Sequence, residues 1–196
     1  MKVYYDGRLN GNDDREITMN ALLRRFFGAG VGLAVAFGTA QAQPSTGAEA
    51  RLKEKNITLP PEAAPVANFV NAVRVGNLLF MAGNTGGPQW AGKGKVGRDL
   101  TVEQGYQAAR DSGLIMLSKV RGALGSLDRV KRVVKVLGMV NAADGFGDTP
   151  QVINGFSDLI VEVFGESIGK HARSAAGIAA LPGNSPVEVE MILEVE

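Results

Sequence analysis

The C-terminal stretch RSAAGIAALPGNSPVEVEMILEVE, residues 173–196, contains the pattern that decides the fold. Over residues 187–195 every odd position is Val, Met or Leu, whereas the even positions are three glutamates and one isoleucine. This alternation predicts a strand with one packed face and one mostly acidic face. Residues 173–181 predict another strand, and we expect the two strands to form a hairpin around Gly183 and Asn184.

The chain before this stretch predicts three more strands and two helices. An apolar run over 69–82, interrupted by a Gly-Asn pair, predicts two strands, and valines of one parity predict a third over 129–140. A helix with a capping box opens at Thr101, and a second helix spans 149–165. This order predicts an α+β fold of two layers, with both helices on one face of a single mixed sheet.

The composition removes several catalytic and metal-binding classes. Among 196 residues there is no cysteine and one histidine, His171. Disulfides, thiolate zinc sites, iron–sulfur clusters and a cysteine nucleophile are therefore excluded, and a Ser-His-Asp triad would depend on His171. The sequence shows no metal-ligand spacing, and we expect neither a metal ion nor a cofactor.

Residues 26–37 form an apolar run, FFGAGVGLAVAF, between two arginines and an Ala-Gln-Ala sequence. The run is shorter than the roughly 20 apolar residues that span a bilayer. Its flanks are typical of a signal peptide over about residues 19–42. We therefore expect an exported protein, periplasmic or secreted, with no membrane contact after cleavage. The twin-arginine route and the general secretory route both remain open.

The charged residues near the N-terminus indicate where translation starts and what net charge the mature protein presents to its partners. Acidic residues upstream of the apolar run are unusual for an export signal, so Met19 is an alternative start. We expect an N-terminal extension and signal peptide over 1–42, a flexible leader over 43–50 and one folded domain over 51–196. Cleavage leaves equal numbers of basic and acidic residues. A balanced surface does not attract phosphates over long range, so nucleic acid is not an expected partner.

The segment Lys170-His171-Ala172-Arg173-Ser174 is a candidate binding site. In an extended strand His171 and Arg173 point to the same side. The planar fork of an arginine binds a carboxylate through two parallel hydrogen bonds, which lysine cannot copy, and an imidazole can donate or accept beside it. A surface salt bridge of Arg173 is the alternative interpretation.

The same region resembles the C-terminal signature of the YjgF/RidA family, also called the L-PSP endoribonuclease family. The resemblance covers roughly residues 56–196 and is nearest to the divergent branch grouped with chorismate-mutase-like proteins. The matching motifs are Arg173-Ser174, Leu181-Pro182 and Val187-Glu188-Val189-Glu190 at the family's spacing, the strand pair over 73–83, and Val152-Ile153-Asn154 at the start of the second helix.

The resemblance implies a chorismate-mutase-like fold and a homotrimer with ligand clefts between neighbouring subunits. It also implies hydrolysis of small reactive 2-imino or enamine carboxylic acids to 2-keto acids and ammonia. Arg173 would bind the substrate carboxylate and Glu188 would place the attacking water, so these two are the expected catalytic residues. The expected substrate-binding residues are Arg173, Phe69, Gly83 and Asn154, together with His171, whose imidazole lies beside Arg173 in the predicted strand.

The expected hairpin bears on how Arg173 and Glu188 meet. The residue opposite Glu188 would lie near Ala179, which is six positions from Arg173, or roughly 20 Å along the strand. One subunit would therefore not bring the two side chains together. A shared site would take Arg173 from one chain and Glu188 from another.

Three departures from the family's pattern leave other functions open. Phe69 stands where many imine-hydrolysing members have tyrosine, Ala82-Gly83 replaces Ser-Gly, and residues 142–148 are an insertion. The two replacements remove hydroxyl groups from the expected cleft. A non-catalytic module that binds small carboxylates or proteins is therefore the alternative function, and an endoribonuclease is the third.

Overall fold

The computed structural model describes residues 47–86 and 92–196. The predicted signal peptide and residues 43–46 of the predicted leader lie outside the described residues. The helices are α1 (Ala48–Glu54), α2 (Val102–Leu124), α3 (Thr149–Phe164) and α4 (Glu166–Gly169), with short 3-10 turns η1 (Leu127–Arg129) and η2 (Pro182–Asn184). The strands are β1 (Ala72–Val75), β2 (Leu78–Thr85), β3 (Val130–Asn141), β4 (Ala172–Ile178) and β5 (Val187–Val195). None of these helices combines the length and the apolar character that crossing a membrane requires.

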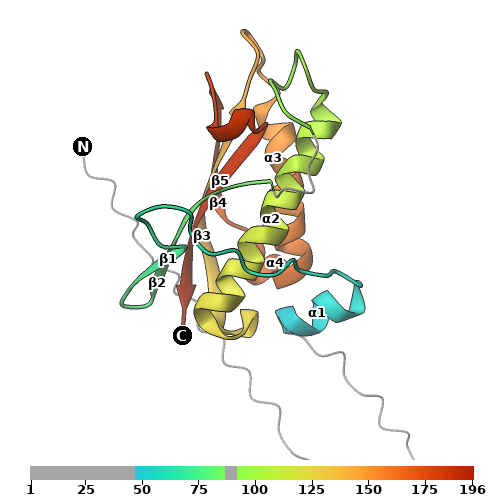
Figure 1. Ribbon diagram of the computed structural model, residues 1–196. Helices are drawn as coiled ribbons and strands as arrows, with labels where there is room; N and C mark the ends of the chain where they lie inside the picture. The colour runs from blue at the N-terminus through green and yellow to red at the C-terminus, as the bar shows by residue number, and fades with distance from the viewer. Residues whose placement is uncertain (1–46, 87–91) are drawn as a thin grey trace, which may run out of the picture. The chain divides into compact units, whose positions relative to one another are not determined.

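The five strands form one mixed sheet in the order β1-β2-β5-β3-β4. Strands β3 and β4 run parallel, whereas the other three neighbouring pairs are antiparallel. Helices α2 and α3 lie side by side on one face of the sheet, as Figure 1 shows. The prediction of a two-layer α+β fold, with one mixed sheet and two long helices on one face, is confirmed.

The predicted hairpin of the last two strands is wrong. Strand β5 lies between β2 and β3, and β4 is an edge strand on the other side of β3. The chain passes from β3 through α3 to β4, and such a helical crossover returns parallel to its first strand. The remaining edge of β3 is taken by β5, which buries its apolar face from Val187 to Val195 in the middle of the sheet.

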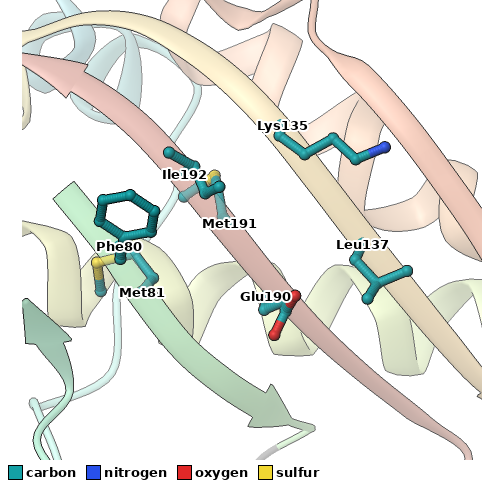
Figure 2. A pocket seen from close by; sticks show the side chains of 7 residues that line it. All are labelled: Phe80, Met81, Lys135, Leu137, Glu190, Met191 and Ile192. Carbon is teal, nitrogen blue, oxygen red and sulfur yellow. The ribbon is translucent and has the colours of Figure 1, made fainter. Parts of the chain in front are cut away.

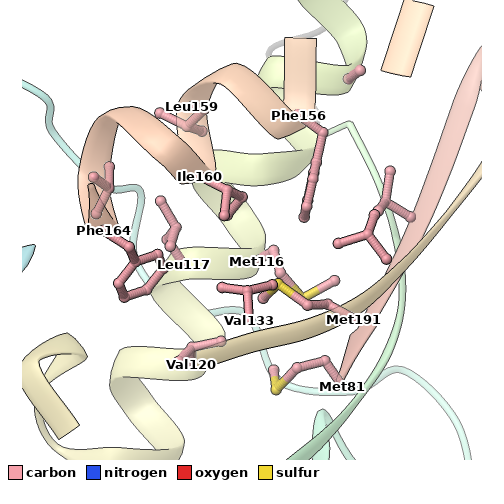
Figure 3. Close-up of a cluster of buried hydrophobic side chains, with 14 of the residues drawn as sticks. Met81, Met116, Leu117, Val120, Val133, Phe156, Leu159, Ile160, Phe164 and Met191 are labelled. Atoms are coloured by element: carbon pink, nitrogen blue, oxygen red, sulfur yellow. The ribbon is translucent and has the colours of Figure 1, made fainter. Parts of the chain in front are cut away.

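The core fills the space between the two long helices and the sheet, and Figure 3 shows part of it. Phe156 of α3, Met116 of α2 and Met191 of β5 are each at most 1% exposed there. Close packing of such side chains leaves a helix little freedom to shift. The core therefore fixes α3 over the sheet, together with the polar side chains that α3 directs toward β4.

The capping box predicted at the start of α2 is present. Thr101 Oγ1 accepts a hydrogen bond from the Gln104 amide at 3.2 Å, and the Gln104 side chain accepts one from the Thr101 amide at 2.9 Å. Thr101→Ala is expected to lower the free energy of unfolding by about 1 kcal/mol, because it removes the acceptor for the Gln104 amide. Urea unfolding of Thr101→Ala beside Thr101→Ser, which keeps the hydroxyl, measures the effect. Equal losses in the two variants would contradict the capping role.

Helix α1 begins before the expected domain boundary at Arg51. Ala48 and Leu52 are buried, and the Glu49 carboxylate accepts hydrogen bonds from the Arg121 guanidinium at 3.0 and 2.6 Å. Residues 48–50 of the expected flexible leader are therefore part of the folded domain. The sequence predicts a short helix over residues 51–55, but two buried residues in a single short helix give too little periodicity to place its start at Ala48.

Candidate functional site

Arg173 lies on the edge strand β4, and its side chain turns toward α3. It is paired with Val136 of β3, whose buried side chain marks the helix-covered face of the sheet. Its Nη1 donates to Asn154 Oδ1 at 2.9 Å and to Ser157 Oγ at 3.0 Å. Its Nη2 donates to the Pro150 carbonyl at 3.4 Å. Successive turns of α3 therefore hold one guanidinium.

The outer edge of the Arg173 guanidinium is open. Within residues 47–86 and 92–196, no group accepts a hydrogen bond from Nε and no carboxylate forms an ion pair with this side chain. The alternative interpretation of a surface salt bridge thus finds no partner in the described chain. An Nε–Nη2 edge without a strong partner can bind both oxygens of a carboxylate.

His171 lies beside Arg173 on the same side of the strand, as the spacing predicts. Its Nδ1 is 2.6 Å from the Gly169 carbonyl oxygen, and its Nε2 is 3.1 Å from Ser157 Oγ. Burial lowers the pKa of His171 below its ordinary value of 6.5; the Gly169 contact opposes this shift and the Arg173 charge adds to it. The imidazole is therefore neutral near pH 7.

Glu188 lies on the other face of the sheet, which the described helices leave uncovered. It is paired with Met139 of β3 and with Thr85 of β2. Burial, and secondly the like charge of Glu190, raise the pKa of Glu188 above its ordinary value of 4.5. A carboxylate with a raised pKa is a better base, which suits it to take a proton from water.

Gly83 and Phe69 lie at the same end of the sheet as Glu188. A Cβ at position 83 would lie 3.2 Å from Glu188 Cδ and closer still to a carboxylate oxygen, so the glycine makes room for this side chain. The Ala82 amide donates to the Asn71 carbonyl, which continues the β1–β2 pairing and brings the chain before Asn71 toward Gly83. Phe69 is 48% exposed in that chain segment.

The predicted site residues therefore fall into two groups, one at the β4–α3 edge and one around Glu188. Val136 and Met139, the β3 partners of Arg173 and Glu188, are three positions apart. An odd spacing places the side chains on opposite faces, with Cα atoms roughly 14 Å apart. Within one chain Arg173 and Glu188 are therefore separate, as expected, but because they lie on opposite faces of the sheet and not because a hairpin holds them apart. The group at the β4–α3 edge, named here the arginine cluster, consists of Arg173, His171, Asn154 and Ser157.

Ser157 is the member of the arginine cluster that sequence reasoning missed. It contacts both Arg173 and His171, each within 3.1 Å. The available signal was its position three residues after Asn154, which places the two side chains on one face of a helix. Because a serine in a helix is ordinarily a surface residue, this spacing alone did not single it out.

A hollow of 190 Å³ lies on the uncovered side of the sheet. Figure 2 shows the side chains that line it, from β2, β3 and β5: Phe80, Met81, Lys135, Leu137, Glu190, Met191 and Ile192. The cross-strand row continues from Phe80 to Val73, which is 52% exposed. The hollow thus lies beside an apolar row, has Lys135 and Glu190 in its own lining, and holds none of the predicted site residues. Among the described residues, no three acidic or histidine side chains are grouped to hold a metal ion.

Known proteins are similar to this chain in sequence and fold. A family model described as "YjgF/chorismate_mutase-like, putative endoribonuclease" matches residues 49–195. "Protein TCP17" of Trypanosoma cruzi is 44% identical over 148 residues, which are 74% of this chain and 92% of that protein. Protein Atu1372 of Agrobacterium tumefaciens, a protein with unknown function, is 40% identical with a TM-score of 0.68, covering 76% of this chain and 91% of that one. A "putative endoribonuclease" of Shewanella oneidensis is 31% identical with a TM-score of 0.72, covering 76% and 99% of the two chains.

The two-layer fold and these matches define a chorismate-mutase-like protein. The chain belongs to the YjgF/RidA family, as its C-terminal motifs predict.

Proposed function

We propose that this protein hydrolyses small 2-imino or enamine carboxylic acids to 2-keto acids and ammonia. The site is shared between Arg173 of one subunit and Glu188 of a neighbouring subunit of a homotrimer. The observation that carries the proposal is the open Nε–Nη2 edge of Arg173, which α3 holds in place and no described carboxylate occupies. The partner is a small carboxylate-bearing molecule, which the protein meets after export.

The reaction needs little more than binding and a base. The substrate carboxylate lies on Arg173, and an enamine first becomes the imine as a proton moves from its nitrogen to carbon 3. Water then adds its oxygen to carbon 2 of the imine as a proton passes to Glu188. Glu188 then passes this proton to the substrate nitrogen. As the C–N bond breaks, the hydroxyl proton of the adduct also moves to nitrogen, so both protons of water leave with ammonia. Imines hydrolyse readily, so orientation and electrostatic stabilisation are sufficient catalysis.

A second copy of the chain would complete the site. Val73, Phe80 and Ile192 lie next to one another on the uncovered face, and Val73 and Phe80 are 52% and 40% exposed. Contiguous apolar surface of this kind is commonly an interface. This apolar row supports the proposal that a neighbouring subunit covers the face, and in the proposed homotrimer the neighbour's arginine cluster lies near Glu188. Sedimentation equilibrium should give three times the subunit mass. A monomer with full activity would contradict a site shared between subunits.

The activity is tested with an imino acid made in the cuvette by an amino-acid oxidase. We expect added protein to speed the loss of the imine and the release of ammonia in proportion to its concentration. Unchanged decay of the imine at micromolar protein would exclude the proposed reaction. Labelled RNA is incubated in parallel with repurified protein, because the family description includes endoribonuclease.

Mixing two inactive variants tests whether the site is shared. In a trimer that contains both Arg173→Ala and Glu188→Gln subunits, some interfaces between subunits combine an intact Arg173 with an intact Glu188. Refolding the two variants together should therefore restore activity that neither has alone. If both residues acted from one chain, the mixture would stay inactive.

Glu188→Gln is expected to lower kcat roughly 100-fold with little change in KM, because the amide cannot take the proton from water. Since the carboxylate is the active form, wild-type activity should fall as pH drops through the Glu188 pKa, which lies above 4.5. Glu190→Gln removes the neighbouring like charge and should move this acid limb to lower pH. An acid limb that stays in place in Glu190→Gln would contradict the assignment.

A carboxylate-binding module without turnover is the second candidate. It is favoured by Phe69 and Ala82, because neither side chain carries the hydroxyl that many imine-hydrolysing members of the family have at these two positions. Calorimetry with pyruvate distinguishes the two functions. Binding that depends on Arg173 without accelerated ammonia release would identify the module.

A further inference from the structure

The hydrogen bonds of the arginine cluster form a chain whose direction is fixed by chemistry. The Gly169 carbonyl can only accept, so His171 Nδ1, 2.6 Å away, carries the proton and donates. In the neutral ring Nε2 is then an acceptor, and the Ser157 hydroxyl, 3.1 Å away, donates to it. Ser157 Oγ in turn accepts from Arg173 Nη1 at 3.0 Å.

These hydrogen bonds determine which edge of the Arg173 guanidinium is left to bind a ligand. Asn154 Oδ1 and Ser157 Oγ both accept from Nη1, and the Pro150 carbonyl lies at the limit of hydrogen-bond distance from Nη2. All three groups belong to α3, so the guanidinium is fixed on the helix side. Nε and the second N–H of Nη2 have no acceptor among the described residues, so the Nε–Nη2 edge is the one left for a ligand.

Holding the arginine in advance favours ligand binding. A free arginine side chain has many rotamers, and a ligand that must select one of them binds more weakly. The neutral state of His171 is part of this arrangement, because a protonated ring would present a donor to the Ser157 hydroxyl. Burial of the ring, which lowers its pKa, keeps Nε2 as an acceptor near pH 7.

We propose that Ser157 and His171 are positioning residues that hold Arg173 with its Nε–Nη2 edge presented to a carboxylate. The inference rests on the proposed function only in taking Arg173 as the carboxylate-binding residue. Neither Ser157 nor His171 need touch the ligand. Ser157 holds Arg173 directly, and His171 acts through Ser157 by orienting its hydroxyl.

The test is the affinity for pyruvate, measured by calorimetry on the full assembly. Ser157→Ala and His171→Phe should each weaken binding about tenfold, the size expected for losing one hydrogen bond to a charged group. His171→Gln should stay within about threefold of the wild type, because its side-chain oxygen can accept from Ser157 near the position of Nε2. The double variant of Ser157→Ala and His171→Phe should lose no more than either single variant, because both act through one chain.

The controls separate this inference from the proposed function. Gln151→Ala, at an exposed position of α3, should bind pyruvate as the wild type does. Melting temperature and sedimentation show whether each variant keeps its fold and assembly. If Arg173→Ala abolishes binding while Ser157→Ala and His171→Phe bind normally, the positioning role is wrong and the proposed function stands. If Arg173→Ala itself binds normally, the proposed function fails. Equal losses in His171→Gln and His171→Phe would also overturn the positioning role.

Discussion

Arg173→Ala should reduce kcat/KM for imine hydrolysis by about 100-fold and abolish calorimetric binding of pyruvate. The reason is that the guanidinium is the only group of the arginine cluster that carries a positive charge near pH 7, since His171 is neutral there. Removing one partner of a hydrogen-bonded charge pair costs about 2–5 kcal/mol, which corresponds to losses of this size. Steady-state kinetics on the purified variant measures the effect.

The matched control for this prediction is Arg173→Lys. Lysine keeps the charge but has neither the planar fork nor enough donors to bond Asn154, Ser157 and a carboxylate edge together. We therefore expect Arg173→Lys to recover less than about a tenth of wild-type activity. Recovery to the wild-type rate would mean that charge alone is sufficient and that the fork geometry is irrelevant. Arg98→Ala, at an exposed arginine paired with Asp99, should leave the rate unchanged.

The elements that the sequence predicts well are those with local signals. The alternation over 187–195 and the capping box at Thr101 depend on residues within a few positions of one another, and both are found as predicted. The pairing of β4 was mispredicted because it depends on the crossover through α3, not on the short link to β5. Strand order depends on the whole chain, and strands that are adjacent in sequence are often, but not always, neighbours in the sheet.

The candidate site shows the same division. The two-residue spacing of His171 and Arg173 predicts that they share a side, and the structure places both against Ser157. The serine itself was missed, because its role appears only when α3 is laid along β4. Gly83 and Glu188 came from the family resemblance, and their contact depends on a close approach of β2 to β5 that composition does not reveal.

The position of α3 depends on a close crossing with α2 at Gly155. A Cβ at this position would lie 2.8 Å from the Tyr106 carbonyl carbon and closer still to its oxygen. Backbone atoms cannot turn aside as a side chain can, so α2 and α3 would have to separate. Gly155 lies between Asn154 and Ser157, and a shift of α3 would also move these two away from Arg173.

Gly155→Ala is therefore expected to destabilise the fold by about 3 kcal/mol, even though alanine in a helix is intrinsically favoured over glycine by about 1 kcal/mol. Urea unfolding measures the loss, and the same variant should bind pyruvate more weakly under native conditions. The matched control is Gly122→Ala in α2, where the three atoms nearest to the new Cβ belong to the carboxylate of the exposed Glu62 side chain, which is held by one exposed hydrogen bond from Asn71. That group can move aside, so Gly122→Ala should be neutral or stabilising. If both variants changed stability alike, helix propensity would outweigh packing at position 155, and the close α2–α3 crossing would not be what holds Asn154 and Ser157 against Arg173.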